Sequence, residues 1–116
     1  MLFDMTQKIT NLNGEVLAAT NKAIADGGEA ATLGFACIEA LISVYERDDQ
    51  VSGKVKMDRY VLAQKIVGAT LPVSLKSDDV VMIKELCAKR FGTLIYGRVA
   101  DMLEHGQPEP EQKAAA

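Results

Sequence analysis

The chain has 116 residues, of which 48% are hydrophobic and 25% are charged, and its formal net charge is -3. A chain of this length predicts one domain whose core needs no disulfide or metal ion for support. The acidic balance argues against a general nucleic-acid binder, because such proteins usually carry a strongly basic surface.

The first predicted element is a small β-hairpin over residues 7–18. Asn13-Gly14 lies between strand-forming residues, and an Asn-Gly pair readily adopts the positive φ angles that a two-residue hairpin turn requires. We expect strands at 7–12 and 15–18. They should pack on helices or pair with another chain, because an isolated hairpin is only marginally stable in water.

A loop and a largely apolar helix are expected next. Residues 19–31 include Gly27-Gly28 and have no firm period, so we expect a loop that is mobile or carries a contact. Thr32 is placed to cap a helix over residues 33–45. Because this helix is apolar around most of its circumference, it should be the central helix of the domain.

A second helix is expected to begin after Ser52, which can serve as its N-cap, and to end near Gly68. Pro72 ends any continuation of that helix. Residues 73–75 are apolar enough to form a short extended segment, which could join the hairpin as a third strand.

The last two helices carry the clearest local signals. Ser77 is the expected N-cap of the third helix, with Asp78 and Asp79 in a first turn where negative charge suits the helix dipole. A Gly92-Thr93 turn separates this helix from a fourth, which is expected to end at Gly106.

These elements predict a mainly α (α+β) fold. Residues 1–106 should form a single domain of four helices with a short N-terminal hairpin. Residues 107–116 are polar and should form a flexible tail, because they offer little apolar surface to bury.

The sequence offers no cluster of reactive side chains. His105 is the only histidine, and Cys37 and Cys87 lie far apart within apolar helical patterns, without a CxxC pair. We interpret these cysteines as buried, reduced thiols; a disulfide between them would need an oxidising compartment. With no phosphate-binding glycine loop, we expect no catalytic residue, no cofactor and no metal site, and hence no enzyme.

Four basic residues of the second helix form a candidate contact for a partner or a phosphate. The simplest interpretation of this group is the solvated side of an amphipathic helix. A functional strip would instead contact a phosphate backbone or the acidic first half of a neighbouring copy. The four residues are Lys54, Lys56, Arg59 and Lys65.

The charges are unevenly distributed along the chain. Residues 1–50 hold three basic against eight acidic residues, a net charge of -5, whereas residues 51–116 hold ten against eight, a net charge of +2. This asymmetry fits a solvated surface or a polar interface between copies of the chain.

A helix-turn-helix is the one nucleic-acid motif that the spacing suggests. Ala88 precedes Gly92 by four positions, as the tight turn of that motif requires. However, the positions of the following helix that should be buried are Arg98 and Asp101, which are both charged. The resulting helix would also offer few cations to phosphate groups, so DNA binding by this motif is disfavoured.

Two stretches of the chain resemble small proteins encoded by tailed bacteriophages and prophages. One runs from Lys8 to Leu17, and the other combines residues 75–84 with residues 94–104. Together they cover about a third of the chain. The resemblance implies a phage context, with no activity that transfers residue by residue.

We therefore expect a non-enzymatic interaction protein, a phage-related accessory or virion-assembly factor that acts through protein contacts, including contacts with copies of itself. The alternatives are a small nucleic-acid-binding regulator and an inhibitor of a host protein. No stretch reaches the ~20 apolar residues that span a bilayer. The expected location is the host cytoplasm, or a virion into which the protein is built.

Overall fold

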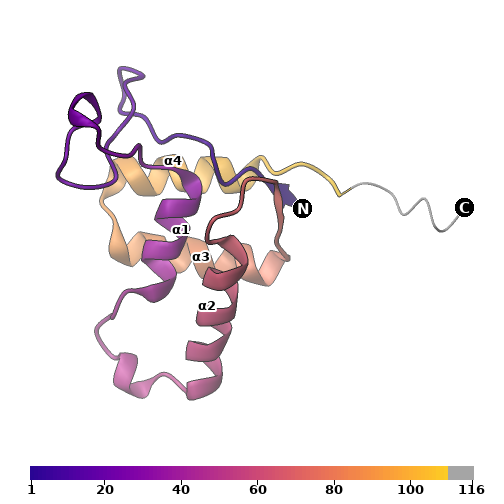
Figure 1. Cartoon of the computed structure of the whole chain (residues 1–116). Coiled ribbons are helices and arrows are strands. Elements are labelled where there is room, and N and C mark those ends of the chain that lie inside the picture. The colour runs from indigo at the N-terminus through magenta and orange to yellow at the C-terminus, as the bar shows by residue number, and fades with distance from the viewer. Residues whose placement is uncertain (110–116) are drawn as a thin grey trace, which may run out of the picture.

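The computed structural model describes residues 1–109 and contains, within them, four α-helices and two short β-strands (Figure 1). The mainly α fold with four helices and a small antiparallel sheet confirms the predicted fold class. The helices are α1 (Leu33–Ile42), α2 (Gly53–Ile66), α3 (Ser77–Arg90) and α4 (Thr93–Glu104), and the strands are β1 (Leu2–Phe3) and β2 (Val73–Ser74).

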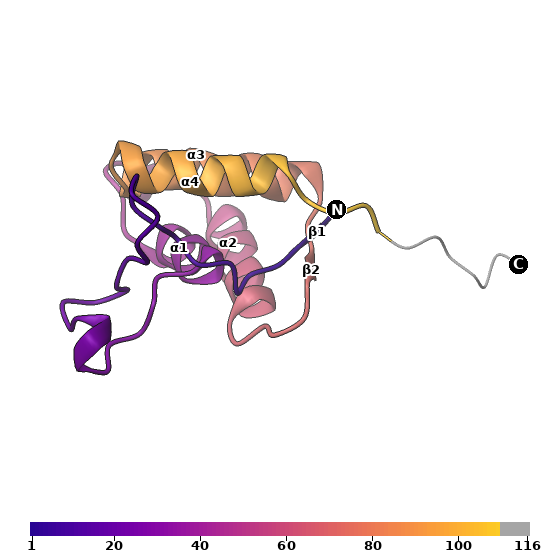
Figure 2. The same cartoon turned by 90° about the horizontal axis from the view of Figure 1, so that it is seen from above.

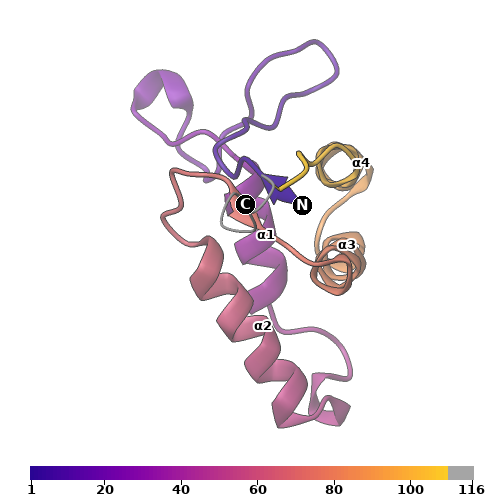
Figure 3. The same ribbon diagram turned by 90° about the vertical axis from the view of Figure 1, so that its right-hand side faces the viewer.

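The helices form two pairs that lie crosswise. In Figure 3, α3 and α4 are seen almost end-on and side by side, whereas α1 and α2 run across the view. α1 contacts α2, α3 and α4, which confirms its predicted place as the central helix. α2 packs mainly on α1 and lies at the outer edge of the molecule.

The core is built from aliphatic side chains of every helix and from the N-terminal segment that crosses α1. Phe3, Met5 and Ile9 come from that segment and are buried. The helices, β2 and Leu75 contribute the other large buried side chains. These are Leu33, Cys37, Leu41, Leu62, Ile66, Val73, Leu75, Ile83, Leu86, Cys87, Val99 and Leu103.

The chain reverses direction at the predicted hairpin, around a turn organised by Asn11. Its side-chain oxygen accepts hydrogen bonds from the backbone N–H groups of Asn13 (2.9 Å) and Glu15 (3.0 Å). Gly14 adopts a positive φ of 87°. Asn11 therefore replaces the predicted two-residue Asn13-Gly14 turn with a longer turn of Asx type.

The predicted strands at 7–12 and 15–18 pair with each other at one isolated bridge, between Thr10 and Val16. The reason is that a third segment enters the pairing. The Ile9 N–H donates to the Ala31 oxygen (2.8 Å), the Leu17 N–H to the Ile9 oxygen (2.9 Å) and the Ala31 N–H to the Leu17 oxygen (2.7 Å). This three-way exchange leaves no continuous two-stranded ladder.

The loop at 19–31 is held by its own backbone. The Ala19 N–H donates to the Glu29 oxygen (2.8 Å), and Ile24–Asp26 forms a turn of 3-10 helix. A Cβ atom on Gly28 would lie 2.1 Å from the Lys22 carbonyl oxygen. The loop can therefore close only around a residue without a side chain.

The sheet joins β1 to β2 in antiparallel register, with Leu2 opposite Ser74 and Phe3 opposite Val73. The prediction that residues 73–75 join the hairpin is wrong, because their partner is β1 at the start of the chain (Figure 2). Phe3 and Val73 are both buried, so this pairing places two apolar side chains in the core.

Gln107 pairs with the other side of β1. The Leu2 N–H donates to the Gln107 oxygen (2.7 Å) and the Gln107 N–H donates to the Leu2 oxygen (2.8 Å). The Ser74 hydroxyl also bonds Glu109. The packed domain therefore extends beyond residue 106, and the predicted tail does not begin at 107. Residues 110–116 of that predicted tail lie outside the described residues.

Two helix starts are as the sequence predicts, and a third is not. The hydroxyls of Thr32 and Ser52 accept the N–H groups three residues later, at 3.1 Å and 3.2 Å. At α3, however, Lys76 is the N-cap and Ser77 is the first helical residue. The Asp79 carboxylate there accepts the Lys76 N–H at 3.0 Å, so a side chain inside the helix, rather than Ser77, closes the first turn.

α1 ends at Ile42 and not at residue 45, as expected from its apolar pattern. The Ser43 hydroxyl donates to the Glu39 carbonyl oxygen and Ser43 adopts an extended conformation, which stops the helix. The next apolar residue, Val44, is consequently exposed.

Candidate functional site

The four basic residues of the candidate strip lie on α2 but do not share one face. Because residues advance by about 100° around a helix axis, Lys54 and Lys65 fall on one side and Lys56 and Arg59 on another. Lys54 pairs with Asp58 at 3.2 Å, and Lys65 is exposed near the C-terminal end of α2. The structure thus brings together only Lys56 and Arg59.

Arg59 is held in place by neighbours within its own chain. Its Nη1 lies 3.2 Å from Asp48 Oδ1, and both side chains are mostly buried. Its guanidinium carbon lies 5.9 Å from the centre of the Tyr45 ring. The Asp48 carboxylate also accepts the Tyr45 N–H at 2.8 Å. That backbone bond, together with Arg59, holds the pKa of Asp48 below its usual value. This arrangement ties the turn at 45–48 to α2.

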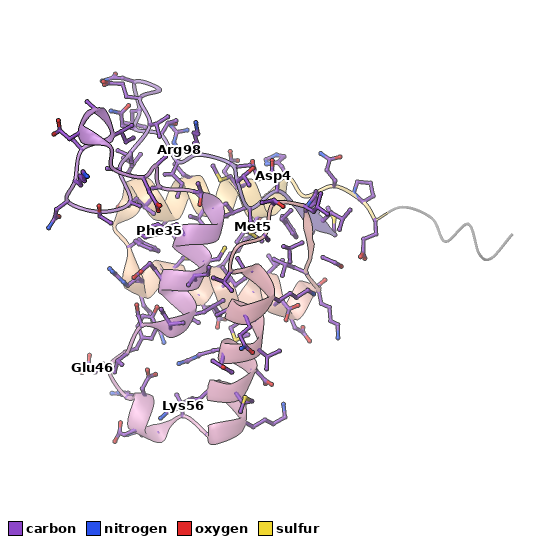
Figure 4. All side chains as sticks on the ribbon, in the orientation of Figure 1. Asp4, Met5, Phe35, Glu46, Lys56 and Arg98 are labelled. Carbon is purple, nitrogen blue, oxygen red and sulfur yellow. The ribbon has the colours of Figure 1, made fainter. Side chains whose placement is uncertain are left out.

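A shallow cavity of about 340 Å³ lies where this turn meets α2. Lys56 projects between α2 and the turn at residues 48–50 (Figure 4). The wall is mostly apolar, with polar groups at one side, a composition that suits a side chain of a partner better than a charged substrate. The lining residues are Leu41, Ile42, Ser43, Val44, Asp48, Lys56, Arg59 and Tyr60.

The outward side of α2 continues this apolar wall. Met57 is 56% exposed, Tyr60 53% and Val61 55%. These residues lie opposite Leu62 and Ile66, which are buried against the core. α2 therefore has two apolar sides, of which only one is covered within residues 1–109. We call Met57, Tyr60, Val61 and the next exposed residue, Val67, the α2 apolar stripe.

The basic residues of α2 are more conspicuous in the sequence than this stripe, and the sequence analysis therefore did not identify it. The signal was present in the spacing of Met57, Tyr60 and Val61, which lie three and four positions apart on the side opposite Leu62. An amphipathic helix needs one such side, so a second apolar side indicates a second contact.

α3 and α4 do not have the geometry of a helix-turn-helix. The two helices of that motif cross steeply, whereas α3 and α4 lie side by side (Figure 3). Arg98 is also not free to contact phosphate. It donates from Nε to the Thr10 oxygen (3.1 Å) and from Nη2 to the Asn11 oxygen (2.8 Å), and it thereby anchors the N-terminal turn on α4 (Figure 4).

Cys37 and Cys87 are both free and buried, as expected, one on α1 and one on α3. Burial raises the pKa of the Cys37 thiol, and the nearby Cys87 raises it further. Burial raises the pKa of Cys87 to about 12. A thiol with a raised pKa is a weak nucleophile at neutral pH, so these side chains act as packing groups.

We expect this burial to make the fold sensitive to alkali. Each thiol stabilises the folded chain below its unfolded pKa of 9.0, and the stabilisation is lost as the pH rises toward the folded value. The free energy of unfolding should fall by up to about 1.4 kcal/mol per pH unit for each thiol. Urea titrations across this window measure it. The Cys37→Ala/Cys87→Ala variant should show a flatter dependence, and an identical slope would contradict the assignment.

Other chemistry has little structural basis in the part of the chain that is described. No group of three His, Cys, Asp or Glu side chains within residues 1–109 could hold a metal ion. His105 is exposed and lies beside Asp101, with 2.7 Å from its Nδ1 to the Asp101 carbonyl oxygen. No helix among these residues is long and apolar enough to cross a membrane.

Comparison with known proteins adds no family to this picture. Neither a protein-family model nor a curated protein nor a solved structure matches the chain.

Proposed function

We propose that this chain is a non-enzymatic interaction protein that works through protein–protein contacts, as an accessory or virion-assembly factor of a tailed phage or prophage. The phage context rests on the resemblance of residues 8–17, 75–84 and 94–104 to small proteins of that origin. Its place of action is then the bacterial cytoplasm or the assembling virion.

The α2 apolar stripe is the observation that carries the proposal. Met57, Tyr60 and Val61 are neighbours on one exposed helix face, and Ile42 and Val44 extend the apolar surface across the cavity. Contiguous exposed apolar patches of this kind mark contact sites on soluble proteins. Tyr and Met are also residue types enriched in protein interfaces, where an adaptable or amphipathic side chain is useful.

The engagement of the charged side chains supports the same proposal. Arg59 is bonded to Asp48, Arg98 to the backbone of the N-terminal turn, and Lys84 to Glu104. These groups hold the fold together, and they lie on different helices rather than at one common site. The geometry likewise gives no support to the nucleic-acid alternative, because Lys54 and Lys65 lie on a different side of α2 from Lys56 and Arg59.

The test is whether the α2 apolar stripe holds the protein in a complex. A tagged chain is expressed in the bacterial host, and the native mass of the tagged species is measured in the lysate. We expect the tagged wild-type protein to run above its monomer mass, which is 12.5 kDa plus the mass of the tag, and the tagged Val61→Asp variant to run as a monomer.

Val81→Asp is the matched control. Val81 lies on a different helix, α3, and is 54% exposed, so the same substitution introduces a similar charge at a similar depth. We expect this variant to keep the wild-type mass. Equal masses for wild type and Val61→Asp, with both proteins folded by circular dichroism, would count against an interaction function of this face.

A further inference from the structure

The α2 apolar stripe is bordered by charges of both signs on one edge of the helix. Lys54, Asp58 and Lys65 all lie on this edge and are exposed, and the Lys54–Asp58 pair described above leaves the Asp58 carboxylate open to a second cation. Asp58 and Lys65 are seven residues apart, which is about 10.5 Å along the helix axis. The opposite edge carries Lys56, beside the cavity.

This pattern is self-complementary. When two copies of a helix pack antiparallel about a two-fold axis, each edge meets the same edge of the other copy with its direction reversed. A two-fold axis near residues 61–62 would then bring Asp58 of each copy to Lys65 of the other. A parallel two-fold arrangement would instead bring this edge to the edge that carries Lys56, so Asp58 and Lys65 of the two copies would not meet.

We infer that α2 pairs antiparallel with α2 of a second copy of this chain, as the contact through which the proposed interaction function operates. The inference rests on that function and commits it to one partner. The symmetry fixes the register, with Tyr60 opposite Gln64 of the partner subunit and Met57 opposite Val67 of the partner subunit. Val61 lies close to the axis, where it meets its symmetry mate.

The apolar contacts in this register join side chains of matching chemistry. Met57 and Val67 are both exposed aliphatic side chains. The Tyr60 hydroxyl already accepts a hydrogen bond from Gln64 Nε2 at 3.0 Å within one copy, so this polar pair can be shared across the axis. The partner subunit's Val67 also comes to the side of α2 that carries Lys56, and thus toward the cavity formed with Ile42 and Val44.

The position of α2 allows such pairing without rearrangement. α2 lies at the outer edge of the molecule, away from α3 and α4, and its outward side faces away from α1 (Figure 3). A contact made by one 14-residue helix and the cavity rim is small. It belongs at the lower end of the size range of specific interfaces, so we expect a dimer with a Kd of about 1–100 µM.

Sedimentation of the purified protein over a concentration series tests the dimer directly. We expect the wild-type chain and the Val81→Asp control to dimerise alike. Val61→Asp should weaken association at least a hundredfold, because it would place two buried carboxylates beside each other at the axis. A wild-type protein that stays monomeric at millimolar concentration would overturn the inference.

Charge exchange tests the register. Asp58→Lys and Lys65→Asp should each weaken self-association roughly tenfold, because each turns two attractive pairs of the dimer into two repulsive ones. A mixture of the two variants should form a heterodimer of wild-type affinity, since both of its charge pairs are again attractive. Failure of the mixture to associate better than either variant alone would overturn the antiparallel pairing.

Cross-linking gives a readout that does not depend on affinity. Cys37 and Cys87 are buried, so a cysteine introduced at position 61 would be the accessible thiol among the described residues. Under oxidising conditions we expect Val61→Cys to form a covalent dimer and Val81→Cys to remain monomeric. Equal cross-linking of both would contradict an axis near Val61.

The inference and the proposed function fail in different ways. A purified monomer that is nevertheless held in a larger complex in lysate, and released from it by Val61→Asp, would overturn the dimer and leave the interaction function standing with another protein as the partner. A purified monomer that is also monomeric in lysate would remove both.

Discussion

Replacing Leu33 by alanine is expected to lower the free energy of unfolding by about 2–5 kcal/mol. Leu33 is fully buried in the first turn of α1, the helix that contacts the other three. Its backbone N–H bonds the Gln7 oxygen at 2.8 Å, and alanine keeps that bond. The loss therefore measures the removed side chain and the cavity left behind. Urea denaturation measures it as a lower midpoint with an unchanged m-value.

The matched control is Ile42→Ala, at the other end of the same helix. Ile42 is 59% exposed, so its truncation should change stability by no more than about 0.5 kcal/mol in the monomer. The difference between the two variants separates burial from helix propensity, because both replace a branched aliphatic residue by alanine within α1. Similar losses at Leu33 and Ile42 would contradict the central position of α1.

Gly106→Ala is expected to destabilise the fold by about 1–3 kcal/mol, although replacing glycine by alanine stabilises a protein where the backbone and its surroundings allow it. A Cβ atom at this position would lie 2.5 Å from Cε1 and 2.7 Å from Cζ of Phe3. Phe3 is buried, so its ring cannot move aside without disturbing β1 and the core beneath it. Thermal or urea denaturation of the variant measures the cost.

Two further variants identify the cause. Gly97 lies within α4 with nothing near its would-be Cβ, so Gly97→Ala should stabilise the protein by about 0.5–1 kcal/mol. Phe3→Leu is destabilising alone, but it removes the ring edge that meets Gly106. The Phe3→Leu/Gly106→Ala double variant should therefore lose less stability than the sum of the two single changes. Strict additivity would exclude the clash.

The helices could be predicted from the sequence because their signals are local. Thr32 and Ser52 cap the helices that follow them, as their position predicts, since capping involves residues only three apart. The end of α1 was missed because Ser43 stops the helix by bonding Glu39, although an apolar pattern continues through Val44 and Tyr45. Side-chain competition of this kind is not visible in hydrophobic periodicity.

The sheet could not be predicted from local signals. β1 and β2 are separated by some seventy residues, and each contributes only two residues to the pairing. The hairpin at Asn13-Gly14 offered a stronger short-range cue, yet Asn11 and the approach of Ala31 determine the actual turn. Short strands carry too few residues to specify their partner by pattern alone.

Part of the candidate surface could be predicted from the sequence. Lys56 and Arg59 were recognised as functional candidates, and they do line the cavity. The role of Arg59 as a brace for Asp48 depends on how the turn at 45–48 folds back on α2, which a linear pattern does not reveal. The apolar residues between the charges were overlooked, although their helical spacing is regular.

The pairing of Leu2 with Gln107 has a consequence for synthesis of the chain. A contact between residues so distant in sequence cannot form until α4 has left the ribosome, because Gln107 follows it. The nascent polypeptide can assemble α1 on α2 earlier, since those helices are sequential. Met5 and Gln7 can join α1 at that stage through the Gly34 and Leu33 N–H groups, whereas the pairing of Leu2 with Gln107 and the packing of Gly106 against Phe3 are expected as a late step of maturation.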